Sequence, residues 1–272
     1  MDPEREQRDA LQAAVAIALA ALLVDVADGL AKRIVRAGGR GTVTPTGRGA
    51  ILTWLGDTIA RLFGASPTAA AAAFATLGTV PQLLAASTRA AVLIAAPTGG
   101  VPTAPEAAVR SWRDPNGLIL SDRIWLAGED ARARLTAVLD AGLARGARPD
   151  ELARELRGFI RPDTAGRTVR GDQAFSSAQR LAAHEINRVH GVATIARARG
   201  AGDLVTWEKS SRHAEADVCD ANARGGPYAP ERVPSFPAHP GCLCHLRRVP
   251  DNGTPAPGGV DGPGLIAALT GL

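Results

Sequence analysis

Apolar residues recur at three- and four-residue steps along much of the chain, and this spacing restricts the fold more than any other feature of the sequence. In the first segment the repeat is carried by Leu11, Val15, Leu19, Leu22, Val26, Leu30 and Ile34. Residues at these steps share one face of a 3.6-residue helix, whereas a strand would alternate at every second residue. The spacing therefore predicts a long helix that buries this face.

Composition favours helices in the rest of the chain as well. The hydrophobic content is 46% but the aromatic content only 4%, so alanine, leucine and valine supply most of the apolar side chains. Alanine has the highest intrinsic helix propensity because it loses no side-chain entropy in a helix. We expect a loop at residues 38–49, a second helix at residues 51–63, and further helices between residues 68 and 96, interrupted near Pro81.

The second half of the chain contains more helices and then changes character. Helical spacing covers residues 121–146, 149–159 and 175–200, although Gly128 and Gly142 interrupt the first of these segments. Residues 204–208 (LVTWE) are β-branched and aromatic, which is typical of a strand, and residues 242–249 (CLCHLRRV) alternate well enough to pair with them. About thirty residues rich in Gly, Pro and Asp separate the two, and so long a loop needs something to pin it.

We therefore predict a mainly α fold, with a helical N-terminal region and a C-terminal α+β module that contains a small antiparallel β element and a long loop pinned by Cys and His. Gly- and Pro-rich stretches set the expected boundaries. These are an Ala-rich helical region at 1–96, a linker at 97–120, the module at 121–250, and a flexible Gly/Pro tail with a short apolar end at 251–272.

The cysteines and histidines of the long loop form a candidate metal site. On a strand, Cys242 and Cys244 would present both sulfurs on one face, and two thiolates can hold a soft ion such as Zn²⁺. Cys219 is the expected third ligand and His239 the fourth, with His213 as an alternative. Such a structural zinc ion would fasten the loop at both ends.

Other interpretations of this cluster stay open at the level of sequence. A disulfide between residues two apart is strained, and an odd number of cysteines, three in all, suggests a reducing compartment. The thiols can also be small buried hydrophobes without metal. A Cys–His nucleophile is the weakest interpretation, since nothing in the sequence resembles an oxyanion-stabilising device.

The formal net charge of +4 permits contact with nucleic acid but does not require it. Arginines crowd one region, and packaged DNA is a candidate partner for a set of them: Arg154, Arg157, Arg161, Arg167 and Arg170. Nearby carboxylates, such as Asp150 and Glu155, also fit a solvated helix face. The apolar run at residues 11–24 is shorter than the about 20 residues that a membrane span needs, so we expect no membrane.

The motif residues of the second half resemble the Mu F-like head morphogenesis family of tailed phages. The resemblance covers residues 121–249, and its elements are SAQRLAAHEINRVHGVAT, a tryptophan strand, Asp-x-Cys and P-x-HPGCLC. The counterparts of the family's motif residues are Arg180, Glu185, Arg188, Trp207, Asp217, Cys219, Pro237, His239, Pro240, Cys242 and Cys244. The chain departs from the family pattern at His184, Leu243 and Asn222, and Asp217 lies one residue closer to Cys219 than usual.

The resemblance implies a minor head protein that acts in head assembly and in DNA packaging or ejection. The N-terminal region shows no nucleophile or carboxylate constellation, so we expect no enzymatic activity. Its implied partners are the portal protein and the major capsid or scaffold protein. Its implied location is the virion, in the head interior or at the portal vertex, after assembly in the host cytoplasm. The alternatives are an internal head protein that contacts DNA, and an enzyme or toxin-related module that uses the Cys/His cluster.

Overall fold

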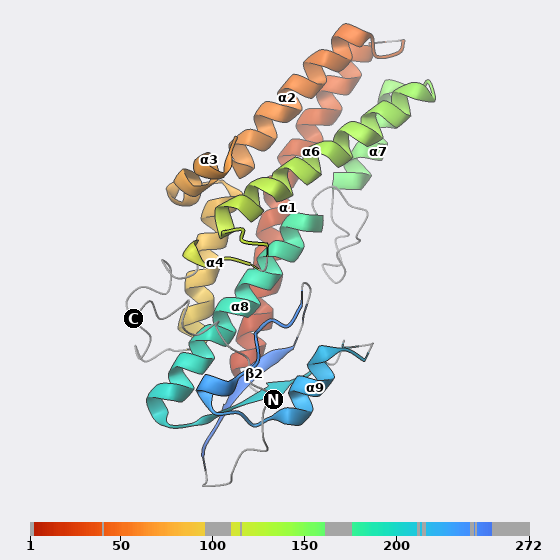
Figure 1. The fold of residues 1–272 in the computed structure, drawn as a ribbon. Coiled ribbons are helices and arrows are strands. Elements are labelled where there is room, and N and C mark those ends of the chain that lie inside the picture. Colours follow the sequence, from red (N-terminus) through yellow and green to blue (C-terminus); the bar gives the residue numbers. More distant parts are fainter. Residues whose placement is uncertain are drawn as a thin grey trace. The chain divides into compact units, whose positions relative to one another are not determined.

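The structure is a computed structural model (Figure 1), and it describes residues 3–39, 41–95, 110–114, 116–160, 176–210, 213, 216–239, 242 and 244–251. The helices are α1 (Pro3–Gly38), α2 (Pro45–Phe63), α3 (Pro67–Ala72), η1 (Ala73–Ala75), α4 (Val80–Ala95), α6 (Leu120–Ala144), α7 (Pro149–Ile160), α8 (Ser176–Ala201), α9 (Val218–Gly225) and η2 (Pro230–Arg232). The strands are β1 (Leu204–Glu208) and β2 (His245–Val249). The predicted fold class, mainly α with a small antiparallel sheet near the C-terminus, is confirmed.

The chain forms two compact units, and neither is continuous in sequence. The first, called the cysteine unit below, comprises Met1–Gln12, Ala85–Ile119 and Ala183–Leu272. The second, called the helical unit, comprises Ala13–Leu84 and Leu120–Ala182. Both units therefore combine segments from the two sides of the predicted linker. Most of that linker and nearly all of the predicted tail lie outside the described residues.

The helical unit is built from amphipathic helices whose apolar faces meet. The spacing of Leu19, Leu30 and Ile34 on α1 places all three in the core, as predicted. Gly128 on α6 has a packing role, because a Cβ there would come within 2.7 Å of the Cβ of Phe63 on α2. The two helices can therefore approach closely at the glycine that interrupted the sequence pattern.

The loop predicted at residues 38–49 is shorter in the structure. Helix α2 already begins at Pro45, before the Ile51 that was expected to start it. The side-chain oxygen of Thr44 accepts a hydrogen bond from the backbone N–H of Gly47, and proline at the first helical position needs no backbone donor. The capping residues thus start the helix before its apolar periodicity begins.

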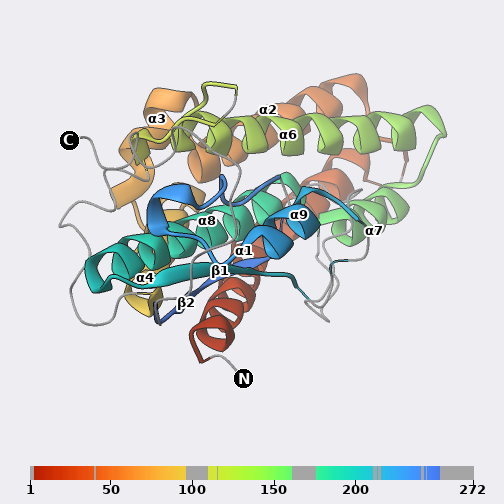
Figure 2. The ribbon, with the colours of Figure 1, turned by 60° about the horizontal axis from the view of Figure 1, so that its bottom comes forward.

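The two strands of the cysteine unit pair antiparallel, with Leu204 opposite Val249 and Glu208 opposite His245. Figure 2 shows α9 beside this sheet. Strand β2 begins at His245, so Cys242 and Cys244 precede the strand on which the sequence had placed them. Their carbonyl oxygens accept hydrogen bonds from a side chain on α8 instead of from a neighbouring strand.

Helix α1 is long and apolar enough to cross a membrane, with a mean hydropathy of 2.2 over its most apolar 18 residues, of which 28% are buried. The segments 67–75 and 80–92 pass the same test only when they are taken together as one bent pair. The core helix of a soluble protein passes this test too, and α1 supplies core residues such as Leu19 and Leu23.

Candidate metal centre

Three of the four predicted ligands come together in the cysteine unit. The Cys219 Sγ, the Cys242 Sγ and a ring nitrogen of His239 all lie within 4.8 Å of one another. The Cys219 Sγ is 3.3 Å from the His239 Nε2 and 3.7 Å from the Cys242 Sγ. Both thiols are buried, whereas the His239 side chain is 35% exposed. Residues 20 and 23 positions apart thus form one cluster of ligand atoms.

Cys219 is positioned by the N-terminus of α9. Asp217 is the N-cap, and its Oδ1 accepts a hydrogen bond of 2.6 Å from the backbone N–H of Cys219. The Asp220 carboxylate reaches back to the backbone N–H of Asp217 at 3.0 Å, which completes a capping box. The Asp-x-Cys motif is therefore a helix start that directs the thiol inward.

His239 and Cys242 are joined by a turn, in which the backbone N–H of Cys242 donates to the carbonyl oxygen of His239 at 3.2 Å. Phe236 holds the loop just before this turn. Its ring packs edge-on against Trp207 of β1, with centroids 5.0 Å apart. A Cβ at Gly191 of α8 would overlap the same ring, so the loop lies directly against that helix.

Cys244, the fourth predicted ligand, is buried in the same core but lies outside the group of three described above. Its thiol is near enough to Cys219 to help raise the pKa of that residue. The predicted alternative ligand, His213, also lies elsewhere, because its Nε2 is 2.9 Å from the Asp220 Oδ2. His245 pairs with Glu208 across the sheet at 2.8 Å.

The electrostatics of the cluster favour neutral thiols in the absence of a cation. Burial, followed by the neighbouring thiols of Cys242 and Cys244, raises the pKa of Cys219 well above its ordinary value. Burial also raises the pKa of Cys242. A buried thiol with a raised pKa is a poor nucleophile, because the thiolate is the reactive form. A bound cation reverses this balance, since it stabilises the thiolates.

The His239 Nε2 contacts two groups, because the Asp217 Oδ2 lies 3.0 Å from it and the Cys219 Sγ lies 3.3 Å from it. A catalytic triad needs the carboxylate and the nucleophile at opposite nitrogens of the imidazole ring. Here both groups face the same nitrogen, so the arrangement is not a triad. Two thiols and an imidazole are instead the donors that Zn²⁺ prefers, and Asp217 adds an oxygen donor next to them. The residues therefore fit a zinc ion.

A second group of ligand atoms comprises His213, Asp217 and Asp220. The Lys209 Nζ lies 2.6 Å from the Asp220 Oδ1, so an ammonium already faces this group. The hydrogen bond from Lys209, followed by those from His213 and the Asp217 backbone, lowers the pKa of Asp220. This group is an ion-pair network around the N-terminus of α9.

The arginines proposed to contact DNA are only partly described. Arg154 lies 3.9 Å from a carboxylate oxygen of Asp150, and the Arg157 Nε lies 3.1 Å from the Asp28 Oδ1. Arg161, Arg167 and Arg170 lie outside the described residues. A nucleic-acid surface at these positions stays a prediction.

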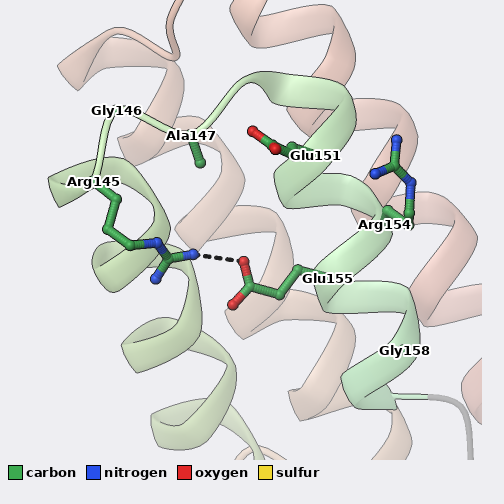
Figure 3. A pocket seen from close by; sticks show the side chains of 7 residues that line it. All are labelled: Arg145, Gly146, Ala147, Glu151, Arg154, Glu155 and Gly158. Carbon is green, nitrogen blue, oxygen red and sulfur yellow. Dashed lines mark hydrogen bonds and ion pairs between the residues drawn. The ribbon is translucent and has the colours of Figure 1, made fainter.

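An open pocket of about 510 Å³ lies between α7 and the loop that follows α6, in the same region (Figure 3). Its lining residues are Arg145, Gly146, Ala147, Glu151, Arg154, Glu155 and Gly158. Arg145 points at Glu155 across the pocket, with an ion pair of 2.7 Å. Two arginines and two glutamates balance one another, so the pocket does not concentrate positive charge for a phosphate.

Two further motif residues form a buried ion pair on α8. The Arg188 Nη2 lies 2.7 Å from the Glu185 Oε2, and both side chains are fully buried. The Arg188 guanidinium also stacks on the ring of Trp112, 4.3 Å from its centroid. Of the remaining motif residues, Arg180 donates to the Ser177 hydroxyl, and Pro240 lies outside the described residues.

Sequence reasoning missed two residues that support the candidate centre. The Asn187 Nδ2 donates to the carbonyl oxygens of both Cys242 and Cys244, at 3.0 Å each. The Arg8 Nη1 donates to the Asn187 Oδ1 at 3.0 Å. Asn187 does lie within the segment SAQRLAAHEINRVHGVAT, but no signal in the sequence connects Arg8 to residues more than 170 positions away.

In comparisons with known proteins, no family model, no curated protein and no solved structure matches the chain significantly.

Proposed function

We propose that this chain is a minor head protein of a tailed bacteriophage, and that a structural zinc ion fastens its C-terminal loop. The observation that carries the zinc site is the convergence of Cys219, His239 and Cys242 within 4.8 Å. The head function is supported by the resemblance of the motif residues to the Mu F-like family. The same motif residues supply the candidate ligands, so the two parts of the proposal agree.

In this proposal Cys219, His239 and Cys242 hold the ion, and the zinc supplies a cross-link between α9 and the segment that precedes β2. The cross-link is structural, because it closes a loop whose described residues form two short helices, α9 and η2. Both thiols lose their protons on binding, so zinc affinity rises with pH. The raised pKa values of Cys219 and Cys242 strengthen that dependence.

A structural zinc site normally has four ligands, and two side chains compete for the fourth position. The Cys244 thiol is buried and close to Cys219, whereas the Asp217 carboxylate lies 3.0 Å from His239. We assign the fourth position to Cys244, because a third thiolate is the softer ligand for the ion.

Titration of the reduced protein with Co²⁺, a spectroscopic substitute for zinc, tests the metal site. We expect one ion per chain, with sulfur-to-cobalt charge-transfer bands that weaken when Cys244 is replaced by Ser. The bands should keep their intensity in Asp217→Asn. If the intact protein develops no such bands at any Co²⁺ concentration, it has no thiolate metal site. The opposite response of the two variants would instead assign the fourth position to Asp217.

Quantitative mass spectrometry of purified phage particles tests the head function. We expect a few copies of the chain per portal ring, in empty as well as DNA-filled heads, because the proposed partners are the portal and the capsid or scaffold. The major capsid protein serves as the internal control for copy number. Absence of the chain from both kinds of particle would contradict the head function and leave the metal site unaffected.

A further inference from the structure

We infer that Arg8 and Asn187 position Cys242 and Cys244, and that metal binding and docking of the first turns of α1 are coupled through this pair. The inference rests on the proposed metal site. It adds two positioning residues that lie far from the ligands in sequence, and it adds a conformational consequence of metal binding. All of the residues involved belong to the cysteine unit.

Asn187 is the central residue of this arrangement. Its amide nitrogen donates one hydrogen bond to the Cys242 carbonyl and one to the Cys244 carbonyl, both of 3.0 Å. The side chain is 1% exposed, so water cannot substitute for these bonds. An asparagine amide has two donors and one acceptor group, which this site uses in full. An aspartate in the same place would lack the donors.

Arg8 holds the other end of the Asn187 side chain. The Arg8 Nη1 donates to the Asn187 Oδ1 at 3.0 Å and approaches the Cys244 carbonyl at 3.4 Å. Only 3% of Arg8 is exposed, and its Nη2 lies 2.6 Å from the Asp9 Oδ1. Burial of a guanidinium costs free energy unless its donors are satisfied. Docking of the first turns of α1 therefore depends on the Asn187 and Cys244 oxygens that accept from Arg8.

The coupling follows from the shared atoms. A metal ion held by Cys242 fixes the backbone of that residue, whose carbonyl is one of the two acceptors for Asn187. An ordered Asn187 presents its oxygen to Arg8, and Gln12 adds a second contact between α1 and the Ala183 carbonyl of α8 at 3.3 Å. By thermodynamic linkage, docking of residues 5–12 must strengthen metal binding to the same extent that the metal strengthens docking.

The positioning role is tested by Co²⁺ titration of Asn187→Ala. We expect about ten-fold weaker binding, the lower end of the effect seen when a partner of a metal ligand is removed. We also expect a shifted sulfur-to-cobalt band, which a loss of stability alone would not produce. Thr194→Ala is the matched control, since it removes a buried polar side chain from the same helix, and the Thr194 hydroxyl donates its hydrogen bond to the His190 carbonyl within α8. If Asn187→Ala does not fold, Arg8→Gln decides, because it leaves Asn187 in place.

The coupling is tested by hydrogen exchange of the reduced protein with and without Zn²⁺. We expect zinc to slow exchange at residues 5–12 in the intact chain and in Thr194→Ala, and to have no such effect in Arg8→Gln. Unchanged Co²⁺ affinity and spectrum in the Asn187 and Arg8 variants would overturn the inference while the metal site stands. Absence of Co²⁺ binding to the intact chain would overturn both.

Discussion

The two units are stabilised by different kinds of interior. Among the described residues, the buried polar side chains of the helical unit are uncharged, namely Thr58, Thr79, Ser121, Ser176 and Gln179. Among the described residues, every arginine, glutamate, histidine and cysteine that is buried as a whole residue belongs to the cysteine unit. Both interiors contain apolar packing, but the cysteine unit adds buried charged groups, imidazoles and thiols whose contacts have defined geometry.

This difference predicts different responses to mutation and to solution conditions. Apolar packing tolerates changes of side chain that conserve volume, whereas a buried polar group that loses its partner pays its full desolvation cost. The cysteine unit should therefore respond to metal, reductant and single polar substitutions. The helical unit should respond mainly to changes of volume. The four predictions below test this contrast, from the largest expected effect to the smallest.

Zinc should have the largest effect, and it should act on the cysteine unit alone. A ligand at 1,000 times its dissociation constant adds about 4 kcal/mol to the free energy of unfolding of whatever binds it. We expect a gain of this size in chemical denaturation of the reduced protein with zinc, and none in Cys219→Ser. Hydrogen exchange resolved by segment should place the gain in β1, α9 and β2. Equal protection of α2 and α6 would contradict the contrast between the units.

Glu185→Gln should destabilise the protein by about 3 kcal/mol, the cost of breaking a buried ion pair from one side. The change replaces the carboxylate opposite Arg188 with a neutral amide of the same shape, in a place where both side chains are fully buried. Urea denaturation measures the effect. The double variant Glu185→Gln with Arg188→Met should recover part of the lost stability, because it also removes the unpaired charge. A double variant that loses more stability than the two single changes together would refute this account.

The features that the sequence predicted well are local ones. Helical spacing identified α1, α6, α7 and α8, because a repeat of 3.6 residues reports the buried face directly. The two glycines of α6 appeared in the sequence as interruptions of a helix, and the packing explains why these positions hold glycine. Gly128 leaves room for Phe63, and Gly142 leaves room for Leu152.

The candidate centre was predictable only in part. Residue type and motif identified Cys219, His239 and Cys242, since soft donors in one loop suggest a shared ion. The strand predicted for Cys242 and Cys244 was wrong. The carbonyl oxygens of both residues accept hydrogen bonds from the Asn187 side chain, which the alternation of CLCHLRRV does not reveal. Arg8 and Asn187 were missed because a hydrogen bond across 179 positions leaves no local pattern.

Matched glycine substitutions compare the two interiors directly. Gly128→Ala in the helical unit and Gly191→Ala in the cysteine unit each place a methyl group against an aromatic ring, Phe63 and Phe236 respectively. Each should cost about 2 kcal/mol through overpacking, measured by thermal denaturation without metal. Only Gly191→Ala should also weaken Co²⁺ binding, because Phe236 anchors the loop that carries His239. A loss of Co²⁺ affinity in Gly128→Ala would show that the metal site depends on the helical unit.

The smallest effect concerns the surface of the helical unit and its dependence on pH. Burial opposes ionisation of Asp130, but hydrogen bonds from Ser177 and Arg134 outweigh it and lower the pKa of the carboxyl. A lowered folded-state pKa contributes stability that is present above the unfolded value of about 3.9 and is lost as the pH falls through the folded value. The side chain is 35% exposed, so the contribution should stay below about 1 kcal/mol. Denaturation of Asp130→Asn should therefore show slightly lower stability than the parent at pH 7 and equal stability near pH 2. If the difference in stability between the variant and the parent persisted near pH 2, Asp130 would act through packing and not through its charge. The surface of the helical unit would then depend on packing, as its interior does.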